Sequence, residues 1–222
     1  GVLLYWGARG LSESGVPVLG PALNSVLASA LGAVASVLGA LPLAFLAVRY
    51  PGRLTLTLER ASYGGYALPP IVLALSLVFL GVRVLPFLYG TLAMLVLAYL
   101  VRFLPQGVGV VRSTLLQLNP HLPEAAASLG QPPAGVFRRV TVPLLRPGLL
   151  AGAALVFLTA MKELPATLLL APIGFDTLAT RVWSATAEGR FAEAALPALV
   201  LMAVSTLGVG LLVSQEGGSA PG

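Results

Sequence analysis

Few side chains in this sequence could do acid–base or metal chemistry, and they are widely dispersed. The 222 residues include eight carboxylates, one histidine and no cysteine. A single histidine, His121, cannot form a metal site alone, and the lack of cysteine excludes disulfides and thiolate ligands. Lys162 and Glu163 are adjacent charges beside an apolar stretch. An integral-membrane enzyme would need paired carboxylates, a histidine cluster or a Ser/His/Asp set within its spans, so we do not expect an enzyme.

The elements that would position these groups are membrane spans. Hydrophobic residues make up 57% of the chain and charged residues 9%, whereas soluble domains carry roughly 25% charged residues. A crossing helix needs about 20 mostly apolar residues. The apolar stretches predict an all-α, polytopic transmembrane bundle with five spans, at 22–48, 62–82, 86–104, 146–164 and 194–213. The arginines are dispersed between these stretches instead of forming a basic stripe with aromatics, so we expect no nucleic-acid partner.

The rest of the chain is divided around these spans. We expect 1–20 to be an extracytoplasmic remnant and linker, 21–213 the transmembrane domain, and 214–222 a disordered tail. In the first span, Gly32, Ser36 and Gly39 recur on about one helix face, where small residues allow helices to approach closely in lipid. A packed helix interface and a generic alanine-rich composition both explain them.

Basic residues predict the orientation, because they are enriched in short cytoplasmic loops. The loops after spans one and three hold more of them than the other side, which also carries most of the acidic residues. We therefore place the segment after span three in the cytoplasm, the N-terminus outside and the C-terminus inside. The first group is Arg49, Arg53, Arg60, Arg102, Arg112, Arg138, Arg139 and Arg146, and the second is Arg9, Arg83, Lys162, Arg181 and Arg190.

The cytoplasmic loop at 113–143 predicts two short helices. Asn119 is a suitable N-cap and Pro120 a suitable first helical residue. Glu124 lies early, where a carboxylate favours the helix dipole, and Gly130 can end the helix in the left-handed conformation. Pro132 and Pro133 would then open a second helix.

In this second helix, Phe137 would be the apolar anchor and Pro143 the stop. A short helix at the membrane surface could dock into a groove on a partner protein. It could equally be an amphipathic helix lying among the lipid headgroups.

The loop resembles the EAA motif of ABC importer permeases. The matching residues are Glu124-Ala125-Ala126, Gly130 and Val140-Thr-Val142-Pro143, with Val142 where leucine is commoner. The resemblance implies a type I importer permease in a bacterial inner membrane, working by alternating access. It also implies that the 119–143 loop couples to a separate ATP-binding subunit, through Glu124, Ala125, Ala126, Leu129, Gly130, Phe137 and Pro143.

The chain has no Gly-x-x-x-x-Gly-Lys-Ser/Thr loop, so we expect no cofactor on it and ATP-Mg on the partner subunit. A passive channel would have no reason to present such a coupling helix. His121, beside this helix, is expected to pack against the partner.

The segments 161–170, 174–179 and 193–197 look like the ferric-iron permeases, which work with a periplasmic binding protein and often join two homologous halves. The chain resembles the C-terminal half, so a second permease half or copy is implied. Polyamine, thiamine, sulfate and molybdate permeases are the alternatives. Carboxylate or phenolate oxygens suit a trivalent ion, yet no cluster of them is visible. Lys162 and Glu163 could line the translocation path or anchor the span, and Asp176 could cap a short helix at 177–187.

Overall fold

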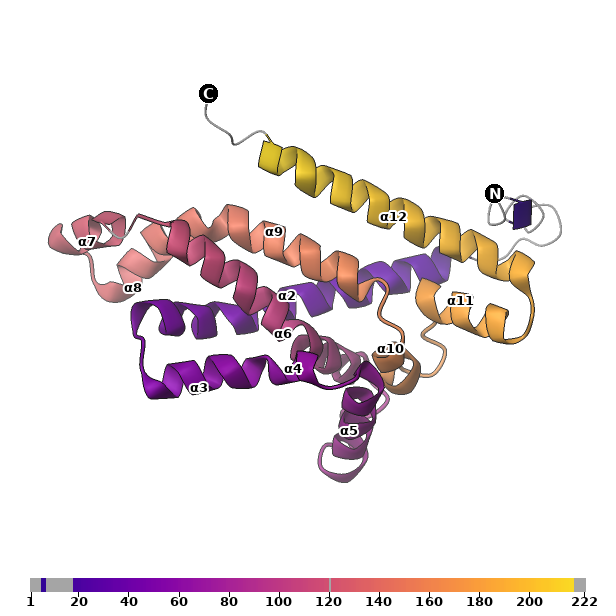
Figure 1. Ribbon diagram of the computed structural model, residues 1–222. Helices are drawn as coiled ribbons and strands as arrows, with labels where there is room; N and C mark the ends of the chain where they lie inside the picture. The colour runs from indigo at the N-terminus through magenta and orange to yellow at the C-terminus, as the bar shows by residue number, and fades with distance from the viewer. Residues whose placement is uncertain (1–4, 7–17, 120, 218–222) are drawn as a thin grey trace.

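The computed structural model describes residues 5–6, 18–119 and 121–217, and every regular element within them is helical. Four helical stretches are long and apolar enough to cross a membrane, and a bent pair of helices makes a fifth if it counts as one span. The predicted all-α, polytopic bundle is therefore confirmed. Figure 1 shows α7 (His121–Ser128) at one end of the bundle and α11 (Leu178–Ala187) at the other, and we call these the α7 end and the α11 end.

The core lies between α2 (Leu19–Arg49) and α6 (Leu92–Gln117). Small residues of α2 are buried there, and a Cβ on Gly32 would lie 2.7 Å from the Tyr99 ring. In the other direction, a Cβ on Gly107 would lie 3.0 Å from the Ser36 carbonyl oxygen. Such close backbone approach is how helices associate in lipid. The packed-interface interpretation of the small residues in α2 is confirmed.

The third span differs from the prediction at both ends. We expected 86–104, but α6 begins at Leu92, capped by the Thr91 hydroxyl, and continues to Gln117. Pro105 lies buried inside it. A proline has no N–H for the carbonyl four residues earlier, here that of Val101. The backbone of Gly65 lies against this carbonyl, so closely that a Cβ on Gly65 would be 2.4 Å from the oxygen.

The longer α6 corrects the orientation argument. Arg102 and Arg112 were counted as charges of a cytoplasmic loop, but both lie inside the helix. The count of loop cations on that side therefore falls by these two residues. The directions of the helices still follow the expected pattern, since α2 and α6 run toward the α7 end (Figure 1).

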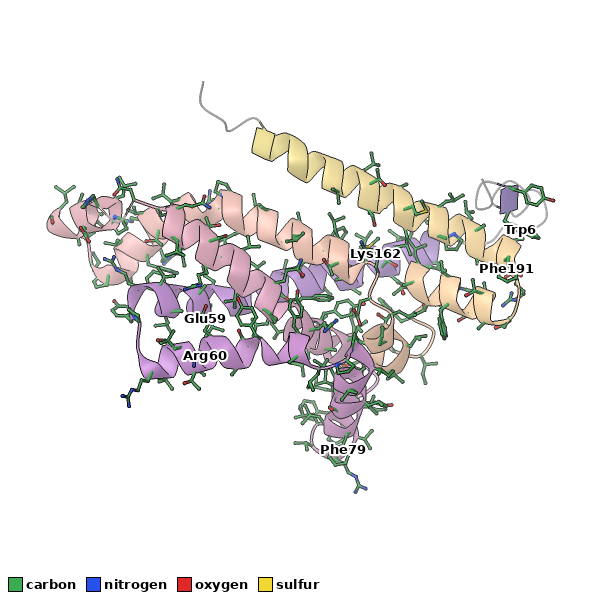
Figure 2. The ribbon with its side chains drawn as sticks, in the orientation of Figure 1. Trp6, Glu59, Arg60, Phe79, Lys162 and Phe191 are labelled. Carbon is green, nitrogen blue, oxygen red and sulfur yellow. The ribbon has the colours of Figure 1, made fainter. Side chains whose placement is uncertain are left out.

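The second span is not the straight helix that we expected at 62–82. α3 (Arg53–Ser62) and α4 (Gly64–Ala67) are followed by α5 (Pro70–Arg83) after a bend of 107°. Leu68 is extended at the bend, as a residue before a proline tends to be. α5 projects from the bundle, with Phe79 exposed near its far end (Figures 1 and 2).

The fourth span begins earlier than the expected 146 and ends earlier than 164. α8 (Pro133–Val136) continues through a π-helical turn, η1 (Phe137–Thr141), into α9 (Val142–Ala160). The prediction that Pro143 stops a helix is wrong, because it lies in the first turn of α9. The Val142 N–H bonds the Phe137 carbonyl five residues back, and this wider turn accommodates the proline.

The α11 end is built by α10 (Pro165–Leu170), α11 and the start of α12 (Phe191–Gly217). The expected short helix at 177–187 is present, and its N-cap is Thr177. Asp176 precedes the cap and pairs with Arg181 at 3.2 Å. Because α12 extends to Gly217, residues 214–217 of the expected disordered tail are helical. Residues 218–222 and most of 1–20 lie outside the described part of the chain.

Candidate coupling surface and candidate translocation path

The ends of α7 are defined by local hydrogen bonds. The Asn119 side chain accepts a bond from the His121 N–H at 3.0 Å, while the adjacent Pro120 is outside the described residues. Gly130 has a φ of +83°. The Gln131 N–H bonds the Ala126 carbonyl at 3.2 Å and the Gly130 N–H bonds the Ala127 carbonyl at 2.9 Å, which is a Schellman motif. The predicted cap and end of this helix are therefore confirmed.

α7 exposes most of its surface. None of its residues is buried, and Leu129, directly after it, is 84% exposed. Glu124 and Ala125 are exposed as well, and Ala126 is half-buried. The Glu124 carboxylate lies 3.4 Å from His121 Nδ1. The chain thus presents a short helix with small residues and one protruding leucine at the α7 end.

A cavity of about 560 Å³ separates α7 from the ends of α2 and α6. Phe137 stands at its side, and its ring contacts that of Phe45 edge-on, with 5.2 Å between centroids. The predicted apolar anchor is confirmed by this contact. α7 is therefore held through α8 and η1 instead of lying flat on the bundle. The cavity is lined among others by Phe45, Arg49, Leu115, Asn119, Glu124 and Phe137.

The structure separates the two candidate path residues. Lys162, just after α9 (Figure 2), is exposed, and Glu163 is half-buried. The Glu163 carboxylate accepts a hydrogen bond from the Ala166 N–H at 3.5 Å. The backbone carbonyl of Glu163 accepts another from the Thr167 hydroxyl at 2.7 Å. Since that hydroxyl has one hydrogen, it must accept the bond that joins it to the Tyr99 hydroxyl at 2.7 Å. Glu163 thus accepts hydrogen bonds from the first turn of α10, and the Tyr99 hydroxyl ties α10 to α6.

Removing the bond between Tyr99 and Thr167 should destabilise the protein. We expect Tyr99→Phe to lower the free energy of unfolding by about 1 kcal/mol, because a buried hydroxyl loses its partner. Tyr99→Phe and Thr167→Val together should cost less than the sum of the two single changes. Thermal unfolding of the purified protein in detergent would measure all three variants. Additive effects would contradict this bond.

Four side chains form a polar row across the middle of the bundle. The row consists of Tyr66, Arg102, Gln106 and Thr159. The Tyr66 hydroxyl donates to Gln106 Oε1 at 3.2 Å, and Gln106 Nε2 donates to the Thr159 hydroxyl at 3.3 Å. The Arg102 guanidinium lies 5.6 Å from the centre of the Tyr66 ring. The last three are half-buried and Tyr66 is exposed, so one side of the row is open.

The sequence argument missed this row. Arg102 was counted with the cytoplasmic segment that follows the third span. The sequence did contain a signal for it. Arg102 and Gln106 lie three and seven residues after Tyr99, a spacing that places these polar side chains on one face of a helix. A charge inside a membrane helix is a functional candidate by default.

A second charged pair joins α3 to α6 nearer the α7 end. Arg112 Nε lies 3.3 Å from the Glu59 carboxylate. Glu59, labelled in Figure 2, is 9% exposed, while the neighbouring Arg60 is exposed. The pair fixes the position of α3 beside α6.

The turn between α11 and α12 carries a charged cluster at the α11 end. Arg190 bonds both Glu193 and Glu188. These bonds, that of Glu193 first, raise the pKa of the Arg190 guanidinium above its usual value. No group of three His, Asp or Glu side chains within residues 5–6, 18–119 and 121–217 could hold a metal ion.

Known proteins match this architecture over nearly its whole length. Residues 22–215 match the family described as binding-protein-dependent transport system inner membrane component. The Fe(3+)-transport system permease protein FbpB 2 of Haemophilus influenzae is 39% identical over 95% of this chain, which spans 42% of that relative. A probable molybdenum ABC transporter permease protein of Haloferax volcanii is 32% identical over 90% of this chain and 76% of its own length.

Among solved structures, an inward-facing MetNI methionine ABC transporter superposes with a TM-score of 0.64 at 18% identity, covering 96% of this chain and 97% of the other. At that identity the likeness concerns the fold, and it agrees with the predicted permease architecture. The family match confirms the predicted resemblance and the prediction of a transport component instead of an enzyme. The chain is a multi-pass membrane protein, and it belongs to the family of inner membrane components of binding-protein-dependent transport systems.

Proposed function

We propose that this chain is the permease part of an ABC importer that moves ferric iron across a bacterial inner membrane. The observation that carries the cargo is the 39% identity to a ferric-transport permease over 95% of the chain. In this proposal a periplasmic binding protein delivers the cargo at the α11 end, and a separate subunit binds ATP-Mg at the α7 end. The chain works beside a second permease half or copy.

The coupling surface is the exposed side of α7. Its exposed or half-exposed residues are Glu124, Ala125, Ala126, Leu129 and Gly130, which a cleft of the ATP-binding subunit would receive. Behind α7, the chain is helical from Pro133 to Ala160, with Phe137 at the start of its π-helical turn and Pro143 two residues after that turn ends. Motion passed from α7 through residues 129–132 to Pro133 would therefore reach the far end of α9 along one continuous helix.

The translocation path runs along the open side of the polar row. Polar side chains at membrane depth face bundle interiors or water-filled cavities, so a second permease half would close this side. Thr159 belongs to the row and sits near the end of α9. Closure of the ATP-binding subunits would move this helix relative to Gln106 and so open or close the path.

Replacing Leu129 with aspartate should abolish binding of the ATP-binding subunit. The side chain is 84% exposed, so the change spares the fold and places a charge in an apolar contact, which we expect to weaken binding by about 100-fold. Co-purification of the two subunits measures it. Ile173→Asp is the matched control, because Ile173 is fully exposed in the segment between α10 and α11. Equal recovery of the ATP-binding subunit with Leu129→Asp would refute docking on this surface.

Uptake by the assembled transporter decides the cargo. The full-length permease, its ATP-binding subunit and its binding protein, reconstituted in vesicles with ATP, should accumulate radioactive iron and not molybdate. Molybdate is the second candidate because of the relative from Haloferax volcanii. Accumulation of molybdate without iron would replace the ferric proposal with that one.

A further inference from the structure

We propose that Arg102, supported by Tyr66 and Gln106, binds an anionic oxygen of the cargo during translocation. Iron would then cross with an oxyanion ligand attached and not as a bare trivalent ion. This inference rests on the proposed path along the polar row, but not on iron being the cargo.

The hydrogen bonding of Arg102 leaves capacity for a ligand. A guanidinium has five N–H donors and no acceptor. Nη1 donates to the Gly65 carbonyl at 2.9 Å. Nε is buried and has no hydrogen-bond partner in the described part of the chain, so the N–H groups left for a ligand are those on the two Nη atoms. A charged group with unfilled donors inside a membrane protein is costly, and a planar guanidinium matches the oxygens of carboxylate and phosphate.

The neighbours of Arg102 hold it in place and add to the same chemistry. The Tyr66 ring stacks 5.6 Å from the guanidinium, and the Tyr66 hydroxyl uses its hydrogen on Gln106 Oε1. The Gln106 amide gives one N–H to Thr159 and retains a second. The open side of the row therefore offers N–H donors and one fixed positive charge, which suit an oxyanion.

The charges around Arg102 disfavour a bare cation. Among the described residues no carboxylate forms an ion pair with Arg102, and the Glu163 carboxylate already accepts the Ala166 N–H. A single carboxylate cannot balance a trivalent ion beside a guanidinium. An oxyanion bound to the iron lowers its net charge and supplies the oxygens that Arg102 can bind.

The test measures uptake with and without an oxyanion. Vesicles containing the assembled full-length transporter and ATP receive iron-loaded binding protein in buffer with or without labelled phosphate, and the iron and phosphate inside are counted. The variants are Arg102→Gln and Arg102→Lys. Arg83→Gln, at the exposed end of α5, is the control. Assembly of each variant is checked by recovery of the ATP-binding subunit.

We expect iron and phosphate to enter together in the wild type and in the control. Arg102→Gln should lower this uptake by about ten-fold or more, as for the loss of a charge-assisted hydrogen bond, and Arg102→Lys should restore part of it. Iron uptake that is the same without an oxyanion, or within two-fold of wild type in Arg102→Gln, would overturn the inference while ferric import stands. Uptake of molybdate alone that is lost in Arg102→Gln would support anion binding and overturn ferric import. Uptake of neither iron nor molybdate would overturn both the anion-binding inference and the ferric-import proposal.

Discussion

Replacing Gly130 with valine is expected to uncouple the transporter. Gly130 has a φ of +83°, a conformation that costs a β-branched residue about 1–2 kcal/mol. The Schellman motif would open, and α7 would lose its angle to α8. We expect ATP-driven uptake to fall by about ten-fold or more, with ATP hydrolysis no longer stimulated by the loaded binding protein. Uptake and hydrolysis in reconstituted vesicles measure the two effects.

Gly90→Val is the matched control. Gly90 has a φ of +74°, has open space around its missing Cβ like Gly130, and lies in the loop before α6. The backbone strain is therefore similar, but the position is away from the coupling surface. We expect a similar loss of stability with coupling preserved. Equal loss of coupling in both variants would mean that general destabilisation, and not the geometry of α7, explains the result.

Replacing Gly65 with alanine is expected to separate α4 from α6. The new Cβ would lie 2.4 Å from the backbone oxygen of Val101, and a backbone atom cannot move aside as a side chain can. We expect a loss of about 1–3 kcal/mol in the free energy of unfolding, as for other overpacked sites. Uptake should fall as well, because the Gly65 carbonyl is the acceptor that orients Arg102.

Gly64→Ala tests whether this effect belongs to the contact. A Cβ on Gly64 meets nothing within 4 Å, so the change should be neutral or should stabilise α4 by up to about 1 kcal/mol through helix propensity. Thermal unfolding in detergent compares the two variants. If both alanines behave alike, the close approach of Gly65 to α6 does not limit stability.

The sequence predicts features well where local chemistry decides them. The cap at Asn119 and the end of α7 at Gly130 depend on side chains and dihedral angles within a few residues. The resemblance of the loop at 113–143 to the EAA motif also depends on residues close together in sequence. The role of the small residues of α2 could not be decided from the sequence. A small residue packed against another helix looks the same in sequence as one that reflects an alanine-rich composition.

The prolines show where sequence reasoning fails. Pro105 lies one residue beyond the expected end of the third span, and Pro143 was expected to end a helix, yet both lie inside helical stretches. At Pro105, the backbone of Gly65 packs against the Val101 carbonyl, which lacks an N–H partner in the helix. At Pro143, a π-helical turn accommodates the absence of a proline N–H. Pro70, for which no role was predicted, opens α5 after the 107° bend. Tertiary contacts decide each outcome, and they are not visible in the order of residues.

The candidate path was predicted only in part. Arg102, which the positive-inside count had assigned to a loop, was not named, although Glu163 was. Lys162, its neighbour in sequence, is exposed. Contacts between helices that are distant in sequence determine which polar side chains come together. One misplaced helix end, that of α6, was enough to hide the polar row.

In the proposed mechanism, the continuous helix from Pro133 to Ala160 would rotate as a rigid body about the π-helical turn. From Thr141 to Thr159 its arm is about 27 Å long at 1.5 Å per residue. A rotation of about 10° at this turn would carry Thr159 roughly 5 Å, by the same geometry. That displacement exceeds the 3.3 Å bond from Gln106 to Thr159, so a rotation of this size would suffice to break the polar row.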